Sequence, residues 1–157
     1  MEKETASYIA GFLDGDGSVR LQIQPRERSF LGFRARTIIS FAQKFGHEKE
    51  LRQIRKNLGI GYLYKRNDGI DELKIEGFDQ VERILKMLYP YVLFKKRQVG
   101  LILKALKILK RKYSNLDFLR VVKIADQISS LNYVTRKKKY TLEFVEKFLH
   151  KGCPRND

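Results

Sequence analysis

Alternating apolar and polar positions predict two pairs of strands in the first half of the chain. Residues 19–24 alternate strictly as Val-Arg-Leu-Gln-Ile-Gln, and Pro25 ends that pattern. A second stretch alternates in the same way, except where Ile38 interrupts it. A later pair of stretches flanks the turn sequence Asn-Asp-Gly at 67–69. We therefore expect two antiparallel hairpins, with strands over 19–24, 33–43, 60–66 and 71–76.

Helical spacing of apolar residues predicts the elements between and after these hairpins. Gly59 and Pro90 end the first two of these helices, and Ser114 with Asp117 forms a cap-like pair before a later one. The expected helices cover 47–57, 78–88, 96–112, 117–131 and 142–149, and residues 152–157 form a frayed tail. The element order predicts an α/β (α+β) fold in a single domain over 1–157; a core at about 6–150 is what the family resemblance described below implies.

The stretch from residue 7 to residue 18 combines a short helix with an unusual placement of glycine and acid. Residues 9–13 predict the helix, yet Gly11 and Gly15 lie four residues apart on one of its faces, where another backbone could approach closely. Asp16 arrives where the helix should end, with Gly17 as the stop. Because the helix dipole is negative there, a nearby divalent cation is expected. Taken alone, a glycine-rich turn with solvated carboxylates explains the stretch equally well.

The polar face of the first predicted hairpin is rich in arginine and glutamine. Up to residue 40 its outward positions carry no acid except Glu27, near the turn. Arginine and glutamine pair bidentately with guanine and adenine edges in the major groove, whereas a solvated strand surface usually carries mixed charges. We therefore favour nucleic-acid contact by this face. Its outward residues in the first strand and turn are Arg20, Gln22, Gln24, Arg26 and Arg28.

The charge balance favours the same partner. The 157 residues include 33 Lys and Arg against 18 Asp and Glu, a formal net charge of +15. Such a balance indicates a polyanionic partner, with nucleic acid before an anionic membrane. Basic runs at 95–97 and 136–139 suit contacts with a phosphate backbone, although each is also typical of a solvated turn.

Several classes of protein are disfavoured by composition. The single cysteine, Cys153, predicts no internal disulfide, and two histidines leave no zinc constellation. No apolar run is long enough to span a bilayer, and the first residues lack the features of a signal peptide, so an intracellular protein is expected. A basic membrane-surface protein is set aside because the chain has no tryptophan anchor and its basic positions concentrate on strands.

Residues 9–17, Ile-Ala-Gly-Phe-Leu-Asp-Gly-Asp-Gly, resemble the LAGLIDADG motif of homing endonucleases. The order helix, hairpin, helix, hairpin, helices also resembles that family's core, in which a four-stranded antiparallel saddle binds DNA. One motif in a chain of this length is similar to the single-motif homodimeric branch, and specifically to the intron-encoded chloroplast-type enzymes. The supporting matches are Gln43-Lys44, 59–62, Pro90 with Lys95 and Gln98, 126–128 and Leu131-Asn132.

The resemblance implies a catalytic centre shared by two copies of the chain. Asp16 and the backbone carbonyl of Gly15 would bind Mg²⁺, which Mn²⁺ would replace, whereas Ca²⁺ would bind without supporting cleavage. Gln43 would order solvent near the nucleophile, and Lys95 would stabilise charge at the scissile phosphate. The motif helices would pair through Ala10, Gly11 and Gly15. Asp14 has no metal-binding role in the family, and His47 replaces an arginine, so a permanent charge is missing there.

The resemblance also implies a substrate and a set of DNA contacts. The substrate would be a long, near-palindromic double-stranded site, cut on both strands across the minor groove to leave 3′ overhangs. An RNA maturase acting on intron RNA, or a non-catalytic DNA-binding regulator on the same fold, remains the alternative. Besides the outward residues named above, the implied contacts are Arg34, Arg36, Ser40, Tyr64, Arg66, Glu72, Lys74, Thr135, Arg136 and Lys137.

Overall fold

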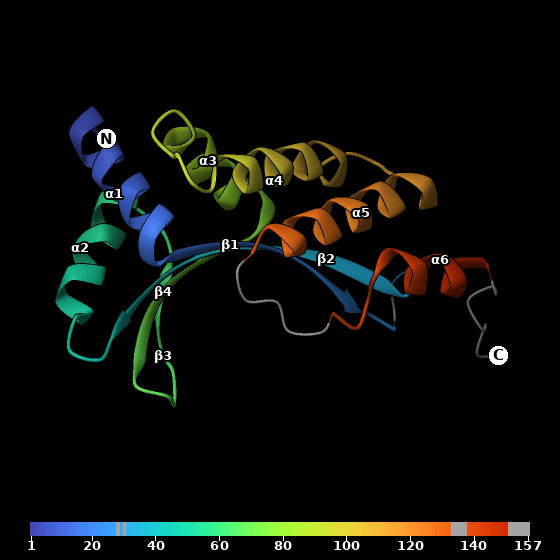
Figure 1. Ribbon diagram of the computed structural model, residues 1–157, viewed down its shortest axis with the longest axis horizontal. Helices are drawn as coiled ribbons and strands as arrows, with labels where there is room; N and C mark the ends of the chain where they lie inside the picture. The colour runs from blue at the N-terminus through green and yellow to red at the C-terminus, as the bar shows by residue number, and fades with distance from the viewer. Residues whose placement is uncertain (28, 30, 133–137, 151–157) are drawn as a thin grey trace.

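A curved four-stranded antiparallel sheet arches beneath a layer of helices (Figure 1). The computed structural model describes residues 1–27, 29, 31–132 and 138–150. The sheet order is β1-β2-β4-β3, so the two predicted hairpins join edge to edge through β2 and β4. The strands are β1 Gly17–Pro25, β2 Phe33–Lys44, β3 Tyr62–Lys65 and β4 Ile70–Glu76.

The helices follow the predicted order with some changes at their ends. The helix predicted at 78–88 is confirmed with those bounds, whereas the first helix begins well before residue 9. Its buried positions Ala6, Ile9, Ala10 and Leu13 form one apolar stripe, which explains the extra N-terminal turns. The helices are α1 Lys3–Asp16, α2 Glu48–Leu58, α3 Phe78–Leu88, α4 Lys96–Leu109, α5 Asn115–Leu131 and α6 Leu142–His150.

Glycines end two helices, and a capping box begins another, at the positions that the sequence predicts and for different physical reasons. Gly59 adopts a left-handed φ of 68° after α2, a conformation that favours glycine. Gly17 instead has an ordinary extended backbone, but a Cβ there would lie 2.6 Å from Leu13 Cδ1. Glycine is therefore needed at residue 17 for space, so that α1 can pass directly into β1. Ser114 and Asp117 form the predicted capping box of α5.

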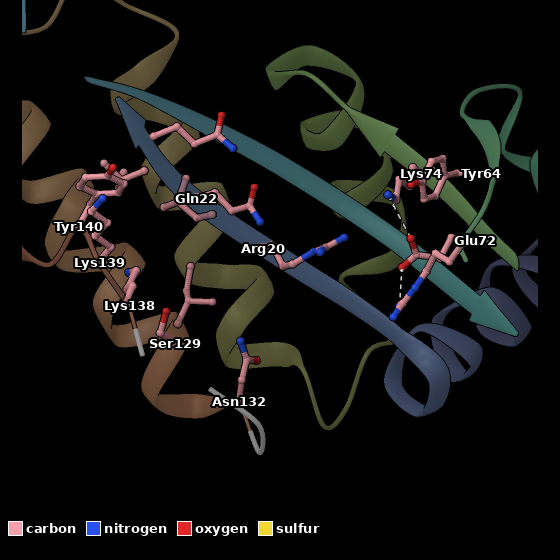
Figure 2. A pocket seen from close by; sticks show the side chains of 15 residues that line it. Arg20, Gln22, Tyr64, Glu72, Lys74, Ser129, Asn132, Lys138, Lys139 and Tyr140 are labelled. Carbon is pink, nitrogen blue, oxygen red and sulfur yellow. Dashed lines mark ion pairs between the residues drawn. The ribbon is translucent and has the colours of Figure 1, made fainter. Parts of the chain in front are cut away.

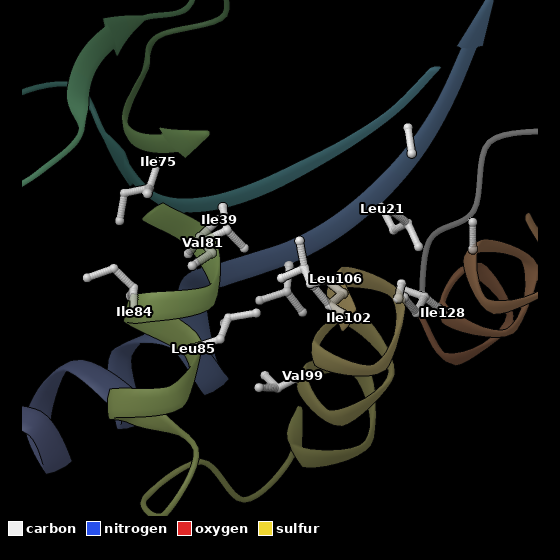
Figure 3. Close-up of a cluster of buried hydrophobic side chains, with 14 of the residues drawn as sticks. Leu21, Ile39, Ile75, Val81, Ile84, Leu85, Val99, Ile102, Leu106 and Ile128 are labelled. Atoms are coloured by element: carbon white, nitrogen blue, oxygen red, sulfur yellow. The ribbon is translucent and has the colours of Figure 1, made fainter. Parts of the chain in front are cut away.

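The core lies between the convex face of the sheet and the helices. Figure 3 shows Leu21, Ile39 and Ile75 on the strands facing side chains of α3 and α4. Ile38, which interrupts the predicted alternation, lies on the opposite, concave face, where Arg20 and Glu76 are its neighbours on the adjoining strands. Burying one face in this way leaves the concave face for polar side chains.

The distal end of the first hairpin is covered by α6. Phe33 packs edge-on against Phe144 and Phe148, with ring centroids 6.4 Å and 5.0 Å away. Asp126 on α5 accepts hydrogen bonds from the backbone N–H of Leu142 and from Lys138 Nζ, both at 2.8 Å. These contacts fix α6 and residues 138–141 at the distal end of the first hairpin. Within the described ranges, no helix combines the length and apolar character needed to cross a bilayer.

Candidate active site and nucleic-acid interface

Asp16 is the last residue of α1, and its side chain is exposed beside the end of β2. β1 starts at Gly17, directly after α1, and Gly17 pairs with Phe41 of β2. Gln43 is two residues further along β2, so it lies beside the end of α1. Gln43 donates from Nε2 to Asp16 Oδ2 over 2.7 Å. The structure thus brings two of the three predicted catalytic residues into direct contact and fixes the orientation of the carboxylate.

Lys95 reaches the same helix end from the start of α4. Its Nζ donates to the backbone carbonyl of Asp14 over 2.5 Å, two residues before Asp16. Partial burial lowers the pKa of Lys95, and the negative charges of Asp14 and Asp16 oppose that shift. The ammonium group therefore lies within the field of both carboxylates. All three predicted catalytic residues gather at the end of α1.

Asp14 has a contact that sequence reasoning missed. Its carboxylate accepts hydrogen bonds from the backbone N–H groups of Leu93, Phe94 and Lys95, at 2.7, 3.2 and 2.9 Å. The sequence does place an acid two residues before Asp16, but nothing in its spacing indicates a partner some 80 residues away. These three donors occupy the Asp14 carboxylate, and its exclusion from the metal ligands stays a prediction.

The donor set at the end of α1 suits a hard divalent cation. Asp16 supplies an exposed carboxylate, and Gly15 lies in the last helical turn, where carbonyl groups lack intrahelical partners. Magnesium prefers such oxygen ligands and usually retains several waters, so one carboxylate from a chain is sufficient. Among the residues that the structure describes, no three His, Cys, Asp or Glu side chains cluster as a complete metal cage. The residues present fit a magnesium ion that is partly hydrated or shared.

The concave face of the first hairpin carries the predicted polar residues in paired rows. Arg36 lies opposite Gln22 in the strand register, and Arg34 lies opposite Gln24, to whose Oε1 it donates from Nη2 over 3.1 Å. Arg26 is exposed just beyond the end of β1. These long side chains line one continuous surface with both donors and acceptors available.

Ser40 has a different position from the one predicted. Its side chain is buried, with 3% of the residue exposed, and its Oγ contacts Ser18 Oγ at 2.9 Å. Arg20 donates to it from Nη2 over 3.3 Å. The prediction that Ser40 contacts DNA directly is therefore corrected, because the residue presents almost no surface. The Ser40 hydroxyl instead accepts the hydrogen bond that holds the Arg20 side chain in place.

Glu72 is also largely buried, although it lines the groove on the concave face, so its predicted DNA contact stays a prediction. It is 6% exposed, with Lys74 Nζ at 3.1 Å and Arg66 Nη1 at 3.6 Å from its carboxylate. The ammonium of Lys74 also lies 4.0 Å from the ring centroid of Tyr64. Glu72 thus holds the two predicted cationic contacts in place. Tyr62 lies opposite Lys74 and adds an aromatic residue, 45% exposed, that was not among the predicted contacts. Partial desolvation of its hydroxyl, and then the negative charge of Glu76, raises the pKa of Tyr62.

A groove of about 750 Å³ runs along the concave face. Figure 2 shows Arg20 and Gln22 on one side of it and Lys138, Lys139 and Ser129 on another. Lys138 and Lys139 belong to the basic run at 136–139 that the sequence indicated for phosphate contacts. The lining residues from α5 were not predicted, because they lie more than 100 positions from the β1 residues that they face. The predicted contacts Arg28, Thr135, Arg136 and Lys137, and the tail at 151–157, lie outside the described residues.

His47 lies at the N-cap position of α2 with an exposed side chain. Its Nδ1 is 3.9 Å from Glu50, its neighbour one turn along the helix. The imidazole therefore stands in an open, solvated position. Within the described part of the chain, the ion-pair neighbour of His47 is an acid, Glu50, so no permanent positive charge stands in for that of an arginine.

The solvent-exposed face of α1 includes Tyr8 and the two glycines. Gly11 and Gly15 are exposed, and a Cβ added to either would meet no atom within 4 Å. Tyr8 on the same stripe is 68% exposed, and the nearby loop exposes Leu93 by 75% and Phe94 by 82%. Ala10, in contrast, is fully buried in the core of its own chain. Its predicted place in an interface between copies is corrected, because it has no surface to offer.

Comparison with known proteins identifies close relatives over most of the chain. The family profile described as LAGLIDADG endonuclease matches residues 9–105. The chain is similar to DNA endonuclease I-CvuI of Chlorella vulgaris, with 32% identity over 136 residues that cover 87% of this chain and 83% of that protein. It is 31% identical to DNA endonuclease I-CreI of Chlamydomonas reinhardtii over 148 residues, covering 94% and 90% of the two chains.

Solved structures of homing endonucleases have the same fold. The crystal structure of homing endonuclease I-CvuI in complex with its target matches with a TM-score of 0.89 at 30% identity, covering 94% of both chains. The archaeal intron-encoded homing endonuclease I-Vdi141I, complexed with DNA, matches with a TM-score of 0.86 and covers 96% of this chain. At 23% identity this second match supports the fold alone. The predicted saddle-shaped fold is confirmed.

Proposed function

Because the chain belongs to the LAGLIDADG endonuclease family, we propose that it is a homing endonuclease that cuts both strands of a specific DNA site. The observation that carries the proposal is the meeting of Asp16, Gln43 and Lys95 at the end of α1, beside a groove lined with basic and amide side chains. A binding protein gains nothing from an exposed carboxylate beside phosphates, because the two repel each other. An enzyme that recruits a metal ion requires one.

The concave face is the proposed DNA-binding surface. Its arginines and glutamines would contact base edges in the major groove, as their donor and acceptor patterns allow. Lys138 and Lys139 at the groove margin would contact the phosphate backbone and fix the register of the protein on the duplex. The net charge of +15 would draw the duplex toward this surface with a strong dependence on salt.

The active form is proposed to be a homodimer. The stripe of Tyr8, Gly11 and Gly15, together with Leu93 and Phe94, forms an apolar face that no described residue of the chain covers. Two exposed glycines let a second helix approach closely, which an identical stripe from another copy would exploit. Two copies related in this way would recognise a long, near-palindromic site and bring two Asp16 side chains together.

The chain's own residues have distinct roles in phosphodiester hydrolysis. Gln43 holds one oxygen of Asp16, which leaves the other oxygen free to bind a cation, and its amide would also order solvent. Lys95 would place a positive charge beside the scissile phosphate, where it stabilises the charge that develops in the transition state. A bound magnesium ion would activate water and stabilise the leaving oxygen. We expect Mn²⁺ to support cleavage, Ca²⁺ to support binding only, and the products to carry 3′ overhangs.

Cleavage of a plasmid library with a randomised site, with wild type and Asp16→Asn side by side, tests this function. We expect discrete, magnesium-dependent double-strand cuts by wild type alone, while Asp16→Asn still retards the selected duplex in gels. The matched control is Asp79→Asn, because Asp79 is an exposed acid on α3 that pairs with Lys110, away from the groove. Equal cleavage by wild type and Asp16→Asn would refute the assignment.

A second outcome would favour binding without catalysis. If neither protein cuts but both retain one DNA or one intron RNA specifically, the fold serves a regulator or a maturase. Parallel retention assays with the selected DNA duplex and with a structured RNA of equal length separate these two alternatives.

A further inference from the structure

The loop before α4 is held by a single side chain from α1. Three consecutive backbone N–H groups, those of Leu93, Phe94 and Lys95, all donate to the carboxylate of Asp14. Charge-assisted hydrogen bonds of this kind are stronger than neutral ones. Asp14 is only partly exposed, so water competes with these donors less than it would on an open surface.

The carboxylate also supplies what the start of α4 lacks. The N-cap residue Lys95 makes no side-chain cap, and its neighbours Lys96 and Arg97 add positive charge where the helix dipole is already positive. The Asp14 carboxylate accepts from the N–H groups of residues 93–95, directly before the first helical turn, and its negative charge offsets the positive charge at this helix end. Asp14 thus stabilises a helix start that the local sequence disfavours.

Lys95 is tied to Asp14 at both of its ends. The Lys95 backbone N–H donates to the Asp14 carboxylate over 2.9 Å, and its Nζ donates to the Asp14 carbonyl over 2.5 Å. A lysine side chain has several free torsions, and fixing both the backbone and the ammonium group removes most of them. Because Asp14 and Asp16 belong to the same helical turn, this pair of bonds sets the place of the ammonium relative to the Asp16 carboxylate.

We propose that Asp14 is a positioning residue, which fixes the loop at 93–95 and holds the Lys95 ammonium beside the Asp16 carboxylate for DNA cleavage. The inference rests on the proposed function, since it names what orders the basic group of that same site. It also explains why Leu93 and Phe94 stay exposed, because their N–H groups point inward to Asp14 while their side chains point away. The Asp14 carboxylate therefore hydrogen-bonds both to Leu93 and Phe94, in the apolar face of the proposed dimer, and to Lys95.

The test compares Asp14→Asn and Asp14→Ala with wild type on the duplex selected from the plasmid library. We expect the single-turnover cleavage rate to fall about 10- to 100-fold, as for other residues that orient catalytic groups, while the dissociation constant for the duplex changes less than about twofold. Asp79→Asn is again the control and should cut as wild type does. Thermal unfolding of each variant shows whether it is folded, and Asp14→Asn serves if Asp14→Ala is not.

A double variant separates positioning from a merely structural role. If Asp14 acts through Lys95, then adding Asp14→Asn to Lys95→Met should lower the cleavage rate no further than Lys95→Met alone. Losses that multiply in the double variant would overturn the proposal. Equal rates for Asp14→Asn and wild type would also overturn it, and would leave the endonuclease function intact.

Amide hydrogen exchange in the free protein gives a readout that does not depend on cleavage. We expect the N–H groups of Leu93, Phe94 and Lys95 to be protected in wild type and to exchange at least about tenfold faster in Asp14→Ala. If wild type cuts no site, the proposed function fails, and this measurement alone decides the positioning role. Unchanged protection in Asp14→Ala would then overturn it.

Discussion

Gln43 donates its side-chain N–H to Asp16 across a 2.7 Å hydrogen bond and so joins the end of β2 to the end of α1. The two residues are 27 positions apart in the sequence, and the register of β1 with β2 brings them together. The bond occupies one carboxylate oxygen and turns the other outward. We expect loss of this hydrogen bond to slow cleavage and to leave the free energy of unfolding almost unchanged, because both side chains are accessible to solvent.

Gln43→Leu removes this bond while preserving the size of the side chain. We expect the cleavage rate to fall about 10- to 100-fold with little change in duplex affinity, because the Asp16 carboxylate loses its orientation. The measurement is single-turnover cleavage of the selected duplex in magnesium. Gln53→Leu is the matched control, since Gln53 is an exposed glutamine on α2 whose amide donates to Asn57 on the same helix, away from Asp16. A wild-type rate in Gln43→Leu would show that Asp16 needs no support.

The elements of the fold could be predicted from the sequence because local periodicity and helix-ending residues determine them. The helix at 78–88, the left-handed Gly59 and the Ser114–Asp117 capping box all depend on residues close in sequence. The meeting of Asp16, Gln43 and Lys95 was expected from resemblance to the family alone. No spacing rule connects a helix end, a strand end and a helix start that lie so far apart along the chain.

Three predicted contact residues are more buried than the sequence indicated, for one physical reason. Ala10, Ser40 and Glu72 carry side chains that suit an interface, yet each is buried in its own chain. Their burial depends on which neighbours the fold supplies: the core under Ala10, Arg20 over Ser40, and two cations over Glu72. Asp14 is the reverse case, a residue with a structural role that the sequence did not indicate. Its partners are backbone N–H groups, which every residue type except proline carries, so the residue types at 93–95 give no sign of the contact.

Asp71 is expected to cost the fold stability. It lies on β4 opposite Gln43, it is 2% exposed, and neither carboxylate oxygen has a hydrogen-bond partner among the described residues. A buried polar group without a partner costs about 1–3 kcal/mol, and more when charged. We therefore expect Asp71→Val to raise the free energy of unfolding by about 1–3 kcal/mol in urea titrations.

Thr37→Val provides an independent comparison for the same principle. Thr37 is 1% exposed, and its Oγ1 has no partner in the part of the chain that the structure describes. Valine has nearly the same shape, so this variant should gain about 1 kcal/mol without leaving a cavity. A loss of stability in Asp71→Val alone would show that a water or ion satisfies that carboxylate in solution.

Glu82 should make stability depend on pH in acid. Lys110 first, and then Lys86 at 2.7 Å, hold the pKa of Glu82 at about 2, below its ordinary 4.5. A depressed pKa in the folded state means that the ion pairs stabilise the protein above about pH 4.5, and that this stability is lost as the pH falls toward 2. Glu82→Gln should therefore lower the unfolding free energy at pH 7 by about 1 kcal/mol or less.

The difference between Glu82→Gln and wild type should shrink as the pH falls from 4.5 to 2. Thermal unfolding at several pH values measures it. Glu146→Gln is the control, because Glu146 has no ion-pair partner within 4 Å among residues 1–27, 29, 31–132 and 138–150. A constant difference between the two proteins across this range would show that the ion pairs of Glu82 do not form in solution.

Gly11 separates the stability of one chain from the association of two. Within the chain, a Cβ at this exposed helical position would meet nothing within 4 Å, so Gly11→Ala should stabilise the monomer by about 1 kcal/mol through helix propensity. In a dimer that pairs the α1 helices closely, the same methyl group would force the backbones apart. We expect the dimer dissociation constant in sedimentation equilibrium to rise at least about tenfold. Ser130→Ala on the exposed face of α5 should improve helix propensity without changing association. If Gly11→Ala dimerises as wild type does, the glycine stripe is not the interface, and the two copies must meet through another surface.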